Sequence, residues 1–266
     1  MYGNHARADF KPGWMDRMQD WKAYPHNPAN HPEYGLSTYN FHSDGSGICL
    51  ASHRRPLFNL RPGYLTWGDT KCSGLRHFPA DTHLIAFLHH HGIDYDVVTD
   101  HDLHRDGVAA IEGYKALVTG SHPEYHTKET LDALQSYRDD FAGNLIYLGG
   151  NGFYWRIAAS DKDASLLEIR RAEDGVRTWA SEPGEYYHSI DGGTHGGLWR
   201  RCGRPPNVLV GVGFAAQATF MGMPYKRVCL DHEDMEWVFN GTDGKTLLGD
   251  FGYSGDFGNF GDFGNS

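Results

Sequence analysis

Residues 121–125 form a short polar segment, SHPEY, whose side chains could carry out chemistry. The segment places an imidazole, a carboxylate and a phenol next to one another, at His122, Glu124 and Tyr125. Pro123 restricts the backbone between His122 and Glu124, which suits side chains that keep fixed directions toward a ligand. The alternative is a loop whose polar groups only cap the helix that follows.

Two more polar turns are candidates for chemistry. Residues 149–152 read GGNG, where the glycines let the backbone approach a ligand closely and Asn151 can orient a carbonyl group or a water molecule. This turn lacks the GxGxxG spacing and the following helix of a phosphate-binding loop, and plain turn geometry is the alternative. Residues 37–47 hold Tyr39, His42 and Asp44 ahead of a glycine turn.

Other catalytic and metal-binding patterns are absent or unfavourable in the sequence. No GxSxG motif is present and no cysteine occupies a strand-to-helix turn, so covalent acyl transfer is disfavoured. His89, His90 and His91 are consecutive, and consecutive helical residues point about 100° apart, so these side chains cannot converge on one ion. His101 and His104 fall in a predicted loop and helix start, which argues against a metal site there.

The candidate turns follow a regular alternation of strands and helices. Apolar residues spaced by three and four predict a helix that starts at Pro79 and stops at Gly92, and another from about Lys128 to Phe141. We also expect a brief helix at 107–114 and strands at 95–99, 116–119 and 144–148. Such alternation predicts a parallel sheet with helices on both faces, an α/β three-layer sandwich of flavodoxin type. Ligands bind beyond the carboxyl ends of such strands, where both turns are expected.

One main domain with irregular ends is expected. Residues 1–35 show no sustained periodicity and are predicted to be an irregular N-terminal segment. The α/β domain is predicted over 36–248, and its part from about residue 156 is a β-rich elaboration. Within this elaboration we expect strands at 166–170, 176–179 and 208–214. The tail, 249–266, repeats Asp-Phe-Gly three times and is of low complexity.

The composition excludes several classes of partner. The chain has 266 residues, with 34 acidic and 24 basic side chains and a net charge of −10, which argues against general binding to nucleic acid or to an anionic membrane. No apolar run approaches the roughly 20 residues that span a bilayer, and the N-terminus lacks the apolar stretch of a signal peptide. Four scattered cysteines suit reduced thiols. We therefore expect a cytoplasmic protein with a small ligand.

Eight segments, taken together and in this order, resemble the C-terminal region of the large (beta) subunit of N,N-dimethylformamidase and its relatives. They are YGLSTYNFHSDGSG at 34–47, RRPLFNLRPGY at 54–64, DYDVVTDHDLH at 94–104, TGSHPEY at 119–125, YLGGNGFYW at 147–155, EPGEYYHS at 182–189, GGLWRRCGRPP at 196–206 and LVGVGF at 209–214. The segments cover most of residues 34–214, and eight motifs in order are specific where one would be weak.

The resemblance implies an amidohydrolase that acts on a non-peptide linear amide and holds one ferric iron. That family's catalytic domain is similar to class I glutamine amidotransferase-like folds, and its iron is held by two tyrosines and one glutamate. On this chain Tyr39 matches one tyrosine, Glu124 matches the glutamate, and Tyr2 of MYGNHA matches the other tyrosine. His122 and Asn151 would line the metal site. A formamide substrate would yield formate and an amine.

These ligands suit the implied chemistry. Phenolates and carboxylates are hard anionic oxygen donors that favour ferric iron. With open coordination positions, the ion can polarise an amide carbonyl and activate a water molecule. His122 would then move the proton that an amine leaving group requires, and Asn151 would hold the carbonyl or the oxyanion.

The chain also departs from the family pattern. It lacks the family's preceding strand and long N-terminal β-sandwich region, and after Val238 it has Asp-Phe-Gly repeats in place of a glycine- and alanine-rich stretch with another acidic site residue. The resemblance therefore implies a domain truncated at both ends, completed by a small subunit or by a second copy. Two alternatives stay open: a non-catalytic ligand-binding or interaction module on the same scaffold, and an inactive truncated paralogue.

Overall fold

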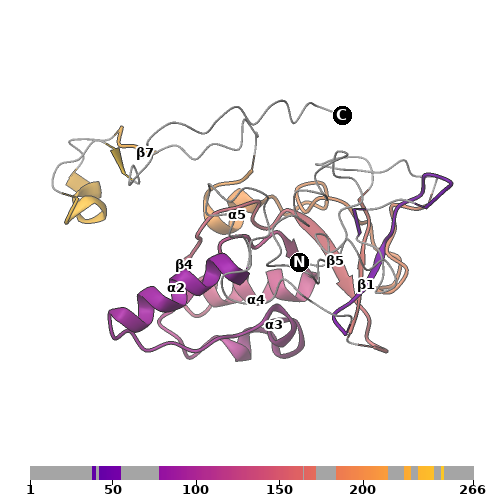
Figure 1. Ribbon diagram of the computed structural model, residues 1–266, viewed down its shortest axis with the longest axis horizontal. Coiled ribbons are helices and arrows are strands. Elements are labelled where there is room, and N and C mark those ends of the chain that lie inside the picture. Colours follow the sequence, from indigo (N-terminus) through magenta and orange to yellow (C-terminus); the bar gives the residue numbers. More distant parts are fainter. Residues whose placement is uncertain are drawn as a thin grey trace, which may run out of the picture. The chain divides into compact units, whose positions relative to one another are not determined.

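The computed structural model describes eight stretches of the chain, which fall into two compact units, Met1–Ala215 and Ala216–Ser266 (Figure 1). The described residues are 38–39, 42–54, 78–163, 165–171, 184–214, 225–228, 233–242 and 247–248. The predicted N-terminal segment, the predicted tail and the expected strand at 176–179 lie outside them. No helix in these stretches has the length and apolar character needed to cross a membrane.

Two predicted helices of the first unit are confirmed. Helix α2 spans Phe78–His90 and is followed by Gly92, whose φ of 62° marks a left-handed residue. Helix α4 spans Lys128–Asp139 and starts at Thr127, whose side-chain oxygen accepts a hydrogen bond from the backbone N–H of Thr130. Helix α4 buries three of the four apolar residues that predicted it, Leu131, Leu134 and Tyr137, so its amphipathic spacing fixes it in the core. The fourth, Phe141, lies beyond the end of the helix and is 47% exposed.

The segment expected as a strand at 95–99 has no regular structure, so this prediction was wrong. A strand needs a neighbour for its backbone hydrogen bonds, and among the described residues β2 pairs only with β4. Val97 is accordingly 72% exposed. Residues 100–106, predicted as a loop and helix start, are helical throughout and form α3, Asp100–Asp106, because Thr99 and Asp102 form a reciprocal capping box that starts the helix.

The strands form a mixed sheet and a separate parallel pair in the first unit. The four-stranded sheet has the order β1 (Leu50–Ser52), β6 (Leu166–Ile169), β5 (Trp155–Ala159), β3 (Tyr125–His126). Only β3 and β5 run parallel in it. The pair consists of β2 (Ala116–Val118) and β4 (Asn144–Ile146), which are parallel as predicted. The fold is therefore mixed α/β, although its described strands do not form one parallel sheet.

The β-rich elaboration is only partly confirmed. Strand β6 agrees with the strand expected at 166–170, but residues 208–214 were wrongly expected to be a strand. They overlap helix α5, Pro206–Val210, because prolines at the N-cap and at the first helical position favour a helix start, and left-handed Gly211 (φ 76°) ends it. The helix expected at 107–114 is a single 3-10 turn, η4 (Gly107–Ala110). In the second unit β7 (Tyr225–Lys226) pairs with β8 (Leu247–Leu248), and a 3-10 helix, η5, spans Glu233–Phe239.

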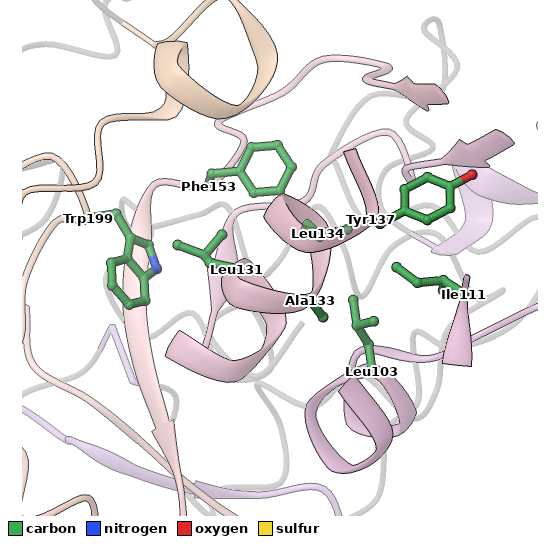
Figure 2. Close-up of a cluster of buried hydrophobic side chains, with 8 residues drawn as sticks. All are labelled: Leu103, Ile111, Leu131, Ala133, Leu134, Tyr137, Phe153 and Trp199. Atoms are coloured by element: carbon green, nitrogen blue, oxygen red, sulfur yellow. The ribbon is translucent and has the colours of Figure 1, made fainter. Parts of the chain in front are cut away.

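The main buried cluster lies around α4. Figure 2 shows its side chains gathered from α3, the residue after η4, α4 and two later segments: Leu103, Ile111, Leu131, Ala133, Leu134, Tyr137, Phe153 and Trp199. Trp199 also donates its indole N–H to the carbonyl oxygen of His126, 3.0 Å away. Phe153 directly follows the GGNG turn and is 1% exposed. The core therefore anchors the glycine turn on one side and the residue after the SHPEY segment on the other.

Candidate active site

The SHPEY segment lies between β2 and β3, and neighbouring elements hold its backbone at several points. Its Ser121 N–H donates to Asp81 of α2, at 2.6 Å. The carbonyl oxygen of Pro123 accepts from Phe153 N–H, at 2.7 Å, and that of Glu124 accepts from the two residues that follow Phe153. The turn is thus tied to α2 and to the start of β5. As predicted, this turn and the GGNG turn both follow the carboxyl ends of parallel strands.

His122 and Glu124 form an ion pair within this turn. His122 Nε2 lies 3.2 Å from Glu124 Oε2, and their side chains are only 14% and 9% exposed. Burial alone would raise the pKa of Glu124, but the hydrogen bond and charge of His122 and the charge of Arg171 outweigh it and lower that pKa below its usual value. The carboxylate therefore stays ionised at neutral pH, as a metal ligand must.

The GGNG turn packs directly on His122. Gly150 has a φ of 76°, and a Cβ placed on it would lie 2.9 Å from both Cα and Nδ1 of His122. Tyr147 closes the turn, since its hydroxyl donates to the carbonyl oxygen of Gly150 at 2.7 Å and accepts from Gly152 N–H at 3.0 Å. Asn151 follows Gly150 and is partly exposed. The structure thus brings the turn that carries Asn151 against the predicted proton carrier.

Tyr39 joins this region from 86 residues away along the chain. Its hydroxyl oxygen lies 2.6 Å from that of Tyr125, the residue after Glu124. Tyr125 in turn accepts a hydrogen bond from Arg171 Nη2, also at 2.6 Å. Residues 122–125 therefore connect three predicted site residues: His122 and Glu124 belong to this segment, and Tyr39 contacts its last residue, Tyr125. Tyr2 lies outside the described residues.

Arg171 is the residue at the centre of this group that the sequence interpretation missed. Its side chain has no exposed surface, and its guanidinium carbon lies 3.9, 5.3 and 4.8 Å from the ring centroids of Tyr39, Tyr125 and Trp155. Burial alone would lower the pKa of Arg171, but the two phenols and the Glu124 carboxylate raise it above its ordinary value. Arg171 therefore carries a full positive charge inside the protein.

The pKa of Tyr125 is also raised, but here burial is the main cause. Burial raises the pKa of Tyr125 well above its usual value, and the nearby Glu124 and Tyr39 reinforce this effect although the charge of Arg171 opposes it. Tyr125 is therefore a neutral phenol with a hydrogen to donate.

Nε and Nη1 of Arg171 are buried without a hydrogen-bond partner, so the guanidinium favours negative charge on the oxygen atoms around it.

The residues present suit a hard metal ion. A phenol oxygen from Tyr39 and a carboxylate from Glu124 are donors that ferric iron prefers, and the unpartnered donors of Arg171 favour the anionic form that such ligands take. In the described stretches no three His, Cys, Asp or Glu side chains gather as a metal site. A metal ion in this part of the chain would therefore need the tyrosine oxygens as well.

The other histidines that the sequence analysis considered have separate partners. His101 and His104 both lie on helix α3, where a loop and helix start were predicted, and they contact different partners. His101 Nε2 is 3.0 Å from His53 Nδ1, and His104 Nδ1 is 2.9 Å from Thr127 Oγ1. The consecutive histidines occupy the exposed end of α2. These side chains link elements of the fold or face solvent.

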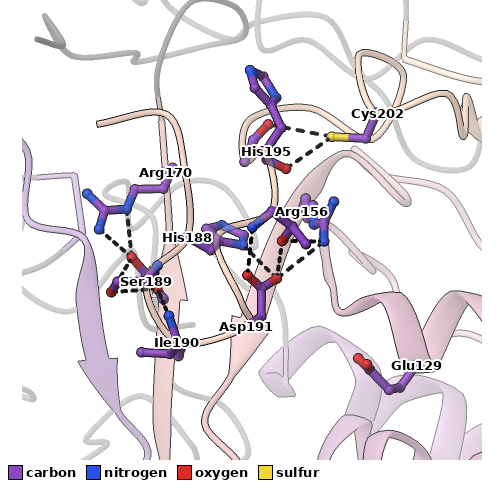
Figure 3. A network of polar contacts seen from close by, with 12 residues as sticks. Glu129, Arg156, Arg170, His188, Ser189, Ile190, Asp191, His195 and Cys202 are labelled. Carbon is purple, nitrogen blue, oxygen red and sulfur yellow. Dashed lines mark hydrogen bonds and ion pairs between the residues drawn. The ribbon is translucent and has the colours of Figure 1, made fainter. Parts of the chain in front are cut away.

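A second polar network supports the strand that leads to Arg171 (Figure 3). The carboxylate of Asp191 accepts from Arg156 at 3.2 Å, from His188 at 3.3 Å and from the Thr194 hydroxyl. Glu168 of β6 is fully buried and accepts from two backbone N–H groups of the 184–198 loop, at 2.8 and 3.0 Å. The network therefore fixes this loop to β5 and β6, whose ends carry the residues around the guanidinium.

Comparison with known proteins agrees with the resemblance seen in the sequence. A family model described as N,N-dimethylformamidase beta subunit-like, C-terminal, matches residues 15–260. The chain is 38% identical over 226 residues to the N,N-dimethylformamidase beta subunit of Paracoccus aminophilus, and 38% identical over 224 residues to that of Alcaligenes sp. Each match covers 82% of this chain but only 28% of the relative, so the chain spans less than a third of these subunits. The chain belongs to the N,N-dimethylformamidase beta subunit-like family and corresponds to its C-terminal part.

Proposed function

We propose that this chain is the catalytic domain of an iron-dependent amidohydrolase, which hydrolyses a small formamide to formate and an amine. The observation that carries the proposal is that Tyr39 contacts Tyr125, the residue next to Glu124, and that Glu124 in turn pairs with His122. Two relatives named as N,N-dimethylformamidase subunits support the substrate class. Tyr39 and Glu124 would hold the iron together with Tyr2.

When bound, the iron would supply a Lewis acid for the amide carbonyl and for an attacking water molecule. The protein would supply the proton transfers. Amines leave poorly as anions, so the amide nitrogen must be protonated as its bond to carbon breaks. The imidazole of His122 is partly accessible, and its contact with the Glu124 carboxylate, 3.2 Å away, orients the ring. His122 would therefore accept a proton from water and deliver it to the leaving nitrogen.

Asn151 would orient the substrate. Its side-chain amide can donate a hydrogen bond to the carbonyl oxygen, which gains negative charge as the amide is attacked. The tight contact between Gly150 and His122 keeps the turn at a fixed place relative to the imidazole. Asn151 and His122 would then act on the two sides of the same amide group, the oxygen and the nitrogen.

The same proposal includes the wider fold and the assembly. A glutamine amidotransferase-like three-layer domain is supported by the parallel β2–β4 pair and by the two turns at its carboxyl ends. A subunit partner, either a small subunit or a second copy, is supported by the relatives, which are named as beta subunits. A cytoplasmic location belongs to the proposal on the grounds of the sequence alone.

The test is formate release by the purified, iron-reconstituted protein. We expect N,N-dimethylformamide to yield formate, and we expect His122→Gln to lower kcat by about 100- to 10,000-fold, the usual contribution of a general acid–base. His90→Gln, at the exposed end of α2, is the control and should keep full activity. Iron bound without release of formate from any small amide would overturn the catalytic proposal in favour of the non-catalytic binding module.

A further inference from the structure

Arg171, Tyr125 and Tyr39 form a chain of two short hydrogen bonds whose direction follows from donor counting. The guanidinium of Arg171 has N–H donors and no acceptor, so in its 2.6 Å contact the oxygen of Tyr125 must accept. A phenol has one hydrogen to give. The other short contact of Tyr125 is 2.6 Å to the oxygen of Tyr39, where the distance alone allows either hydroxyl to donate. If Tyr39 donated, the hydrogen of Tyr125 would have no acceptor among its contacts with the described residues, so donation by Tyr125 is the arrangement that satisfies both hydroxyl groups. In this contact Tyr39 is therefore the acceptor.

We propose that Tyr125 is a positioning residue that, oriented by Arg171, donates a hydrogen bond to the phenol oxygen of Tyr39 and holds this oxygen as a metal ligand. The inference rests on the proposed iron site and goes beyond its ligand set. Because Tyr39 oxygen receives a hydrogen from Tyr125, its own hydrogen is not engaged in that contact and can be replaced by a metal ion.

Arg171 differs from Arg156 of β5 and from Arg170, which directly follows β6, in how its charge is balanced. Arg156 pairs with Asp191, and Arg170 pairs with Glu168, through direct contacts to carboxylates. Arg171 instead lies against three aromatic rings, and two of its nitrogens lack partners. Its charge is therefore not cancelled by a contacting carboxylate, and it polarises the hydroxyl of Tyr125 toward Tyr39.

Arg171 is not in a position to contact a substrate. The guanidinium has no exposed surface, so a substrate cannot touch it, and its influence passes through Tyr125. The aromatic rings also restrict its movement, since cation–π contacts hold it on the faces of Tyr39 and Trp155. The arrangement fixes both the place and the direction of the hydrogen bond that Tyr39 receives.

The first experiment compares iron binding by Tyr125→Phe and Tyr137→Phe. Each variant removes one buried hydroxyl with little change in shape, but Tyr137 donates to the carbonyl oxygen of Tyr114 in the α4 core. We expect Tyr125→Phe to lower iron affinity about 10- to 100-fold, the usual cost of losing a partner of a metal ligand. The phenolate-to-iron absorption band should also move to longer wavelength, because Tyr39 becomes more electron-rich. Native affinity and band position in Tyr125→Phe would overturn the proposal.

A second measurement reads the same hydrogen bond without iron. With tyrosine labelled by 13C at Cζ, the Tyr39 resonance is identified by its loss in Tyr39→Phe. In the iron-free protein this resonance should shift in Tyr125→Phe and stay in place in Tyr137→Phe. An unshifted resonance overturns the inference even if iron binds. A shifted resonance in a protein that binds no iron supports the hydrogen bond from Tyr125 and refutes the proposed iron site, so the two failures are distinguishable.

Discussion

Replacing Gly150 by alanine should disturb the candidate site through one added methyl group. Gly150 adopts a φ of 76°, and an added Cβ would lie 2.8 Å from the carbonyl oxygen of Ser121 and 2.9 Å from Cα and Nδ1 of His122. Two of these three contacts are to backbone atoms, which cannot rotate away. Relief of the clash therefore requires the SHPEY turn to move away from the GGNG turn, and His122 moves with it.

The cost has two parts that a matched control separates. A left-handed conformation costs a non-glycine residue about 1–2 kcal/mol. Forcing a methyl group into a packed contact adds about 1–3 kcal/mol. Gly92→Ala carries only the first cost, because Gly92 has a φ of 62° and nothing within 4 Å of an added Cβ. We therefore expect Gly150→Ala to be the more destabilising variant by about 1–3 kcal/mol, which is the packing cost.

Urea unfolding followed by circular dichroism measures both variants against the native protein. The comparison uses the difference between the variants, because both share the loss of backbone freedom in the unfolded state. Equal free energies of unfolding for Gly150→Ala and Gly92→Ala would refute the close contact between the two turns. A similar loss of formate release in both variants would contradict the placement of the GGNG turn against His122.

Three further predictions concern the framework of the site. Leu134→Ala removes a buried side chain of α4 and should lower the free energy of unfolding by about 2–5 kcal/mol in urea titrations, and a loss below 1 kcal/mol would contradict its core position. Glu168→Gln weakens the charge-assisted bonds to the loop and should cost about 1–3 kcal/mol, seen also as faster amide exchange at Ser189. His188 is buried, donates to Asp191 and has no partner for Nε2, and burial lowers its pKa. The unfolded state therefore takes up its proton first as pH falls below about 6.5, and stability drops by up to about 1.4 kcal/mol per pH unit until the folded pKa is reached. His188→Asn, which can still donate to Asp191, should show a smaller drop between about pH 7 and pH 5.5, and equal drops would contradict the assignment.

The sequence predicted correctly those parts of the fold that are determined by residues close together in the chain. Helix α4 has apolar residues at helical spacing and a threonine cap, so its limits follow from neighbouring residues. The expected strand at 95–99 failed because a short apolar run becomes a strand only beside another strand, which lies far away in sequence. The expected strand at 208–214 failed because its apolar residues were given more weight than the prolines before them.

The same distinction holds for the candidate site. His122 and Glu124 are two residues apart on a backbone restrained by Pro123, so their pairing was predictable from the segment itself. The contact between Tyr39 and Tyr125 spans 86 residues and was not predicted, although the family resemblance did assign Tyr39 and Glu124 to the same site. Arg171 gave no usable signal, because its role depends on aromatic rings from three separate segments closing around it. The one available hint was a pair of arginines directly after an apolar strand.

Iron content is the measurement that tests the central claim most directly. The purified protein, reconstituted with iron and freed of excess metal, should retain about one iron per chain and show a phenolate-to-iron absorption band in the visible range. Tyr39→Phe should lose the band and most of the iron, whereas Tyr187→Phe, at an exposed tyrosine, should keep both. A native protein that retains no iron, or a Tyr39→Phe variant that keeps native iron and colour, would contradict the account.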